Sequence, residues 1–293
     1  MGTLYEIRNL KCSYDKHFVP GESKVVMDIR HLDIPKGKKV FIVGESGIGK
    51  STVLEVLGLM NNTLVSGPGS KFVFHDGDGS EHDLLGLWAS GRDDTLSSFR
   101  LKHFSFIFQS TNLMRNFTAI ENIAVTRMLQ GYSAEESYSA ATGIVNDLGL
   151  PDLGRERMAQ ELSGGQQQRL AFARAVLPDF SVLFGDEPTG NLDPDNAERV
   201  MAILAYRLDR QEGSTAIIVS HDMHLAVSFA DVVIKIRKER SASSDYADDS
   251  HSFGVIDTSC LYARSDDRQI WSNGVDSYSP GDFELFLKKT EAL

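Results

Sequence analysis

Glycines, a lysine and hydroxyl side chains are concentrated in one short segment that could bind phosphate groups. In such a loop, backbone N–H groups curl around phosphate oxygens, and the start of the next helix adds its positive dipole end. Lys50 can bring its charge to the β- and γ-phosphates of a nucleotide, while the Ser51 hydroxyl can ligate Mg²⁺. We expect Thr52 to contact the α-phosphate. The whole segment comprises Gly44, Glu45, Ser46, Gly47, Ile48, Gly49, Lys50, Ser51 and Thr52.

A second motif with catalytic potential consists of two acidic residues at the end of an apolar run. Residues 182–184 are Val-Leu-Phe, which predicts a buried strand that delivers Asp186 and Glu187 to one edge of a sheet. Asp186 suits a Mg²⁺ contact through water, and Glu187 suits a base that orients and polarises the attacking water. The alternative is a strand end with two solvated acids. The phosphate loop upstream favours the catalytic interpretation, and together the motifs predict an ATP site.

A third segment places a hydroxyl and glycines at the start of a predicted helix, residues 166–177. It consists of Ser163, Gly164, Gly165 and Gln166. A helix N-terminus of this kind favours another anion, although one nucleotide site does not need two such loops. The economical explanation is a head-to-tail homodimer, in which this segment binds the γ-phosphate held by the second copy. The alternative is a glycine-rich helix entry without a ligand.

The surrounding elements predict an α/β fold that positions these motifs. Residues 39–43 predict a buried strand before the phosphate loop, and 51–59 predict a helix after it. Strands at 182–184, 216–219 and 232–236 alternate with helices, which indicates a largely parallel sheet. One of these helices spans 194–208, with Asp193 as its N-cap and Pro194 in its first position.

The remaining elements extend this core. Short strands are expected within 5–34, and a helical insertion is expected at 113–161. Two capping boxes support helices there, one at Thr118 and Glu121 and one at Ser133 and Glu136. Gly149 fits a helix stop.

In this order and spacing, the motifs resemble those of ATP-binding-cassette (ABC) ATPases over residues 3–238. Further matching segments are Gln109 in Ile-Phe-Gln, residues 190–193, and His221 in Ser-His-Asp. The resemblance implies a P-loop NTPase core with a mostly parallel sheet, an N-terminal antiparallel β subdomain and a helical insertion. It also implies that Gln109 touches Mg²⁺ and the attacking water, that His221 contacts the γ-phosphate, and that Asp193 works across the dimer interface.

An aromatic residue ahead of the phosphate loop is a further feature of the family. Tyr14 occupies that place and is our candidate for stacking on adenine, since a flat ring face suits a base. Phe18 is the second candidate. The alternative for both rings is ordinary packing, or a place in a loop.

Within the family, the sequences of residues 108–122 and 186–193 are similar to those of the ATPases of lipoprotein release, macrolide export and bacterial cell division. That similarity implies a subunit that dimerises around two MgATP molecules, hydrolyses ATP and powers integral membrane permease or extraction subunits. We expect it in the cytoplasm, held on the cytoplasmic face of the inner membrane by those partners. The alternative is an ATP-dependent scaffold or regulatory protein that gates a complex without transport.

Composition bears on the partners. The net charge of −11 disfavours nucleic acid, and residues 61–161 lack the long heptads of chromosome-maintenance and DNA-repair ATPases. No apolar run approaches the roughly 18 residues that cross a bilayer, and the first ten residues carry no cationic and apolar leader. Cys12 and Cys260 lack metal-ligand spacing and suit a reducing compartment as core or incidental thiols.

Three regions fall outside the shared motifs. Residues 75–83 are rich in Asp and His, but their glycines do not match a calcium loop, so we expect a hairpin turn and assign no metal. Residues 112–126 offer Leu113, Met114 and Phe117 as a groove for a partner's helix; packing on a helical face is the alternative.

The third region, 239–293, is expected to be an acidic, exposed extension that closes a sheet edge or binds a regulator. Residues 240–293 hold five Lys or Arg and ten Asp or Glu. Removing the extension should spare ATP binding, unless Val255, Ile256 and Trp271 belong to the core.

Overall fold

The chain forms two compact units in a computed structural model. Unit 1 comprises Met1–Leu96 and Val219–Leu293, and unit 2 comprises Ser97–Ile218. The structure describes residues 2–15, 19, 23–150, 157–190, 192–210, 213–240 and 252–289. Phe18, the second candidate for adenine stacking, lies outside the described residues, as do Asn191 and most of the Ser/Asp-rich stretch after residue 240.

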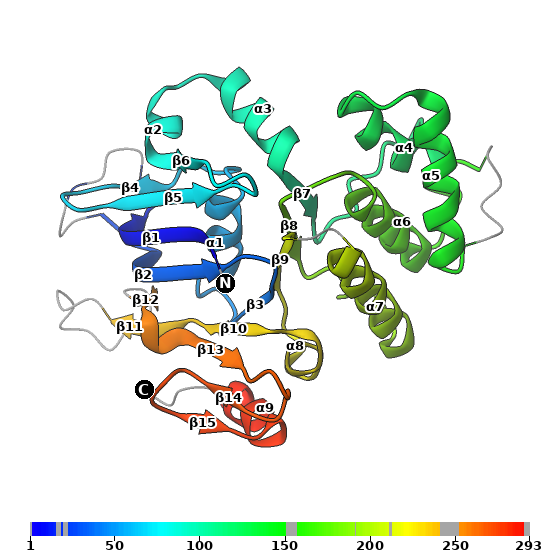
Figure 1. Cartoon of the computed structure of the whole chain (residues 1–293). Helices are drawn as coiled ribbons and strands as arrows, with labels where there is room; N and C mark the ends of the chain where they lie inside the picture. Colours follow the sequence, from blue (N-terminus) through cyan, green and yellow to red (C-terminus); the bar gives the residue numbers. More distant parts are fainter. Residues whose placement is uncertain are drawn as a thin grey trace. The chain divides into compact units, whose positions relative to one another are not determined.

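A mostly antiparallel sheet forms one part of unit 1 (Figure 1). Long strands β1 (Thr3–Cys12) and β2 (Met27–Pro35) pair with each other, and β5 (Lys71–His75) pairs with β1 on its other side. This arrangement confirms the predicted N-terminal β subdomain. The short strands β4 (Leu64–Val65) and β6 (Glu81–Asp83) add to β1 and β5. The pairing of β5 with β6 confirms a hairpin at 75–83.

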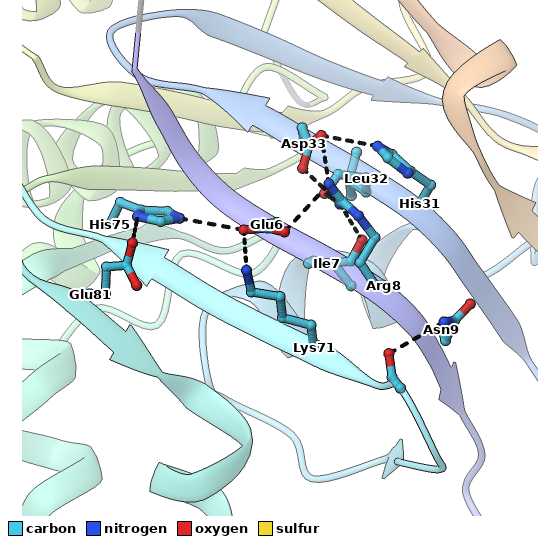
Figure 2. Close-up of polar contacts among 11 residues, drawn as sticks. Glu6, Ile7, Arg8, Asn9, His31, Leu32, Asp33, Lys71, His75 and Glu81 are labelled. Carbon is cyan, nitrogen blue, oxygen red and sulfur yellow. Dashed lines mark hydrogen bonds and ion pairs between the residues drawn. The ribbon is translucent and has the colours of Figure 1, made fainter.

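The exposed face of this sheet carries a connected set of charges (Figure 2). Arg8 on β1 donates two hydrogen bonds to Asp33 on β2, at 2.7 and 2.9 Å, and the ring of His31 lies 3.0 Å from the same carboxylate. Glu6 joins Arg8 to Lys71 on β5. The Arg8–Asp33 and Glu6–Lys71 pairs each join neighbouring strands, and such cross-strand pairs help to stabilise the sheet.

A second group of strands in unit 1 contains the element that leads into the phosphate loop. Strand β3 (Lys39–Val43) runs parallel to β10 (Val232–Lys235) and is followed by helix α1 (Lys50–Leu57). Beyond β10 come β13 (Leu261–Arg264), β14 (Trp271–Ser272) and β15 (Ser277–Tyr278), each antiparallel to its neighbour. The other helices of this unit include α2 (Leu84–Ala89), α8 (Met223–Phe229), η3 (Thr258–Cys260) and α9 (Pro280–Lys288).

The C-terminal region is built into unit 1. Strand β12 (Ser252–Ile256) lies between β11 (Arg237–Arg240) and β2, parallel to β2 and antiparallel to β11. Val255, Ile256 and Trp271 are fully buried, so the expectation of an exposed segment is wrong for these residues. The acidic composition of the C-terminal region gave no sign that these three residues bury apolar surface. A boundary between residues 238 and 239 remains a prediction.

Unit 2 combines three strands with a helical layer in its described part (Figure 1). Strand β7 (Phe104–Ile107), which follows α3 (Asp93–His103), runs parallel to β8 (Val182–Asp186), and β9 (Thr215–Val219) lies on the other side of β8. Stacked rings of Phe106 and Phe184 join β7 to β8. The helices are α4 (Ala119–Leu129), α5 (Ala134–Asp147), η1 (Ala159–Glu161), α6 (Gly164–Val176) and α7 (Pro194–Arg210).

The helix signals of this unit follow local sequence. Both predicted capping boxes are present, since Thr118 caps α4 and Ser133 caps α5. Gly149 adopts a φ of 65° just after α5, which confirms the predicted helix stop. Leu113 and Phe117 precede α4, so the alternative that placed them on a helical face is wrong. Among the described residues, no helix has both the length and the hydropathy needed to cross a membrane.

Candidate nucleotide site

The phosphate loop connects β3 to α1 in a conformation that requires glycine. Gly47 and Gly49 adopt φ angles of 76° and 101°, in the left-handed region that favours glycine. A Cβ atom on Gly49 would lie 2.9 Å from Met27 Cε and 3.3 Å from Val26 Cγ1, so these two side chains would have to shift to admit a side chain there. Gly47 and Gly49 therefore allow the loop to curl, and the missing side chain at Gly49 lets the loop lie close to Met27 of β2.

Lys50 is folded over this loop. Its Nζ donates hydrogen bonds to the carbonyls of Gly44 (3.0 Å) and Glu45 (2.7 Å), and the residue is buried. The ammonium group therefore lies where the loop begins, and its contact with the β- and γ-phosphates stays a prediction. Ser51, in the first turn of α1, is exposed.

Tyr14 marks another part of the loop. Its hydroxyl lies 3.0 Å from Thr52 Oγ1, while 58% of the residue's surface is exposed. The structure thus brings Tyr14 to the phosphate loop and leaves its ring accessible. Its stacking on adenine stays a prediction.

His221 follows β9 and belongs to unit 1 with the loop. Asp222 beside it caps α8, accepting a hydrogen bond from the Leu225 N–H at 2.9 Å. His221 lines one cavity together with Gly44, Glu45 and Ser46. Within unit 1, Tyr14 therefore lies beside Thr52 and His221 lies beside Gly44, Glu45 and Ser46, and the roles of these residues toward a nucleotide stay predictions.

The carboxylates and Gln109 are arranged along one edge in unit 2. Ile107 on β7 pairs with Gly185 on β8, so Gln109, just after β7, and Asp186, the last residue of β8, lie at the ends of neighbouring strands. Glu187 adopts a φ of 49°, which is uncommon for a residue with a side chain. Such a conformation costs on the order of 1–2 kcal/mol and is concentrated at functional sites. A turn holds it, with the Gly190 N–H donating to the Glu187 carbonyl at 3.1 Å.

The third motif is the N-terminus of α6. Ser163 caps the helix by accepting from the Gln166 N–H at 3.3 Å, and Gln166 Oε1 accepts in return from the Ser163 N–H at 2.9 Å. Gly164 is exposed and Gly165 is half-buried, so this helix end is accessible to an anion. Further along α6, Gln168 donates to the Pro188 carbonyl at 3.0 Å, which ties the helix to the loop after Glu187.

Asp193 is exposed and caps α7, as predicted. Its carboxylate accepts hydrogen bonds from the Asn196 side chain (2.7 Å) and backbone N–H (3.1 Å). These bonds hold the pKa of Asp193 below its ordinary value. The structure thus holds the expected site residues as two sets, one in each unit.

Four lysines near the loop were missed by sequence reasoning. Lys235, Lys238, Lys288 and Lys289 line the same cavity as Ser46 and His221. Lys288 and Lys289 belong to the acidic C-terminal region, where two adjacent lysines give no sign of their location. Only the fold of that region brings them to the loop.

These features define a class of protein, the P-loop ATPases that carry a second glycine motif at a helix start. A sequence profile of the family described as ABC transporter matches residues 27–190. The chain belongs to this family, and it is an ATP hydrolase of the transport-powering type.

Individual relatives agree with this assignment. The lipoprotein-releasing system ATP-binding protein LolD of Syntrophotalea carbinolica is 37% identical over 232 residues, covering 78% of this chain and 93% of the relative. The macrolide export ATP-binding/permease protein MacB of Aggregatibacter actinomycetemcomitans is 37% identical over 235 residues. That match covers 80% of this chain but 33% of MacB, so the chain spans about a third of such relatives.

A solved structure supports the fold. The ATP-binding cassette MJ0796, described as a dimer in a post-hydrolysis state bound to ADP and Pi, superposes with a TM-score of 0.65 at 28% identity. The superposition covers 79% of this chain and 94% of the cassette. The predicted α/β P-loop architecture is thereby confirmed.

Proposed function

We propose that two copies of this chain bind two MgATP molecules between them and hydrolyse ATP to drive a membrane-bound transport or extraction complex. The observation that carries the proposal is the geometry of the phosphate loop, in which glycines in the left-handed region and the folded-back Lys50 form an anion cradle. The dimeric state of the MJ0796 cassette supports the composite arrangement.

Within each copy, the chain's own residues have distinct tasks. Lys50 and the loop N–H groups hold the β- and γ-phosphates, Tyr14 stacks on adenine, and His221 contacts the γ-phosphate. Glu187 accepts the proton of the attacking water, which Gln109 helps to orient. From the second copy, the α6 N-terminus faces the same γ-phosphate with Asp193 beside it, through Ser163, Gly164, Gly165 and Gln166.

The residues present fit a magnesium ion. Oxygen ligands suit this cation, and the Ser51 hydroxyl, the Asp186 carboxylate and the Gln109 side-chain oxygen would hold it with the phosphates and water. Bound there, Mg²⁺ would neutralise the charge that develops on the phosphates.

A membrane permease is the partner we propose. LolD belongs by name to a lipoprotein-releasing system, and MacB is by name a permease as well as an ATP-binding protein. By analogy, this chain would lie on the cytoplasmic face of the membrane, against its partner. A pocket lined by Asn112, Leu113, Arg115 and Gln167 is our candidate for receiving a short helix of that partner.

The Glu187→Gln variant tests the catalytic part of the proposal. It keeps the size of the side chain but removes the base, so ATP turnover should fall by roughly 10²- to 10⁴-fold. ATP binding should survive, and the variant should elute from a sizing column as a dimer only with MgATP. Lys50→Ala is the control and should lose binding itself.

Normal turnover in Glu187→Gln would exclude Glu187 as the base, and a permanently monomeric variant would exclude the shared site. A purely regulatory role, the alternative, predicts that adding the native membrane complex leaves turnover unchanged.

A further inference from the structure

The cavity beside the phosphate loop has one wall that the shared motifs do not supply. Ser46 and His221 line it, and so do Leu287 and Lys288 at the end of α9 and Lys289 directly after that helix; Lys288 and Lys289 are called the α9 lysines below. All of these residues belong to unit 1. The C-terminal region therefore reaches the loop of its own chain.

The cavity is rich in positive charge although the chain is acidic. Lys235 and Lys238 from β10 and β11 line it with the two α9 lysines, and Glu45 is the one acidic side chain in the described lining. Lys238 lies 3.5 Å from that carboxylate, so one lysine is neutralised there. Lys235 is buried, and its Nζ donates to the Phe286 carbonyl of α9 at 3.3 Å. In a chain of net charge −11, a lining with more lysines than acids still favours an anionic ligand.

The α9 lysines are held in place by packing. Phe283 and Leu287 of α9 are buried, and Phe283 stacks on Trp271 with 4.8 Å between ring centroids. At the opposite end, Ser279 caps the helix. Glu284 lies 3.2 Å from His224 on α8, the helix that follows His221. Because these contacts hold α9 against its unit, the position of its last residues is also fixed. The negative end of the helix dipole favours cations there.

The two ends of the expected nucleotide can be told apart along the loop. In the proposed function Tyr14 stacks on adenine, and because its hydroxyl lies 3.0 Å from Thr52 Oγ1, these two residues mark the base and α-phosphate end. Lys50 Nζ, on the carbonyls of Gly44 and Glu45, marks the β- and γ-phosphate end. The α9 lysines share a cavity with Gly44 and Glu45, and so lie at the terminal-phosphate end.

We propose that Lys288 and Lys289 are additional nucleotide-binding residues, which contact the terminal phosphate of the ATP held by the same chain's phosphate loop. Lys288 is 2.6 Å from Glu284, an exposed pair that is weak enough to exchange for a phosphate. Lys289 makes no side-chain ion pair within the described residues. The proposal rests on the proposed function and adds to it a preference for ATP over ADP.

Equilibrium calorimetry on the full chain tests this with MgATP and MgADP as probes. In Lys289→Gln and Lys288→Gln, the Kd for MgATP should rise about fivefold to twentyfold, as for loss of a charge-assisted hydrogen bond. The Kd for MgADP should change less than twofold. Lys289→Arg, which keeps the charge, should restore most of the affinity.

Controls separate the possible failures. Lys11→Gln removes an exposed lysine from β1 and should leave both Kd values unchanged. If the wild type binds no MgATP, or Lys50→Ala still binds it, the proposed function itself fails. If those two behave as expected but the α9 variants match Lys11→Gln, or weaken ATP and ADP equally, the role of α9 is overturned. Tighter binding of MgATP would likewise overturn it, because α9 would then obstruct the site.

Discussion

At the scale of single residues, Gly254 shows how closely the C-terminal region packs on the phosphate loop. A Cβ atom at this position would lie 2.5 Å from Met27 Cε and 2.6 Å from the Ile48 carbonyl oxygen. The Gly254 N–H also donates to the Val26 carbonyl at 3.0 Å. Because Gly254 has no side chain, β12 can pack directly against the backbone of the phosphate loop.

We expect Gly254→Ala to damage nucleotide binding from outside the loop. Because the Ile48 oxygen is backbone, the methyl group must displace either β12 or the loop, at a cost of about 1–3 kcal/mol. Thermal unfolding should shift down and calorimetry should show clearly weaker MgATP binding. Gly281→Ala, in the same C-terminal region but with no atom within 4 Å of the added Cβ, is the matched control and should do neither. Equal behaviour of the two variants would contradict this explanation.

The two thiols are core residues, as one sequence interpretation had it. Cys12 and Cys260 are both buried. Burial raises the pKa of the Cys12 thiol to about 12 and raises that of Cys260 as well. Both therefore remain protonated and unreactive at neutral pH.

At the scale of elements, the charges across β1 and β2 make the antiparallel sheet sensitive to acid. Partial burial alone would raise the pKa of Asp33, but hydrogen bonds from Arg8 and His31 outweigh it and hold that pKa below its ordinary value. A carboxylate with a depressed pKa stabilises the fold above its unfolded pKa of about 3.9, and this contribution is lost as pH falls through the folded value.

Asp33→Asn should accordingly lower Tm at pH 7 and have less effect as the pH approaches 4 and falls below it. The measurement is a series of thermal unfolding curves of both proteins across this range. A difference in Tm that stays constant with pH would show that the charge of Asp33 is not what stabilises the sheet.

Local elements were predictable because their signals lie within a few residues of each other. Thr118 and Ser133 predicted two helix starts, and the apolar run at 39–43 predicted β3 with its observed bounds. The phosphate loop and the two carboxylates were equally readable, since each motif is contiguous. The pairing of β12 with β2 could not be predicted, because these strands lie more than 200 residues apart and share no local sequence pattern. The same distance concealed the α9 lysines.

At the scale of the whole molecule, the C-terminal region behaves as part of a folding unit. Its buried residues include Trp271 and Phe283, and Tyr262 packs on Phe283 with 5.1 Å between ring centroids. A chain that ends after residue 240 would expose the Val232–Lys235 edge that β13 covers and would lose β12 from between β11 and β2.

We therefore expect truncation after residue 240 to give an insoluble or strongly destabilised protein, in contrast to the simplest expectation from composition. Solubility and circular dichroism of the truncated chain provide the measurement. Removing residues 290–293 alone is the control, because the described end of α9 is then kept. A soluble truncated chain that binds MgATP normally would show that unit 1 folds without these strands.

The position of β12 also has a consequence for synthesis of the protein. The ribosome makes the phosphate loop early, but the strand that supports it emerges about 200 residues later. At about 5–20 residues per second, this corresponds to a delay of roughly 10–40 seconds. During that interval the nascent chain contains the phosphate loop but not yet β12, the strand that packs against it. The binding energy of ATP can therefore stabilise the loop in its supported conformation only after β12 has been synthesised.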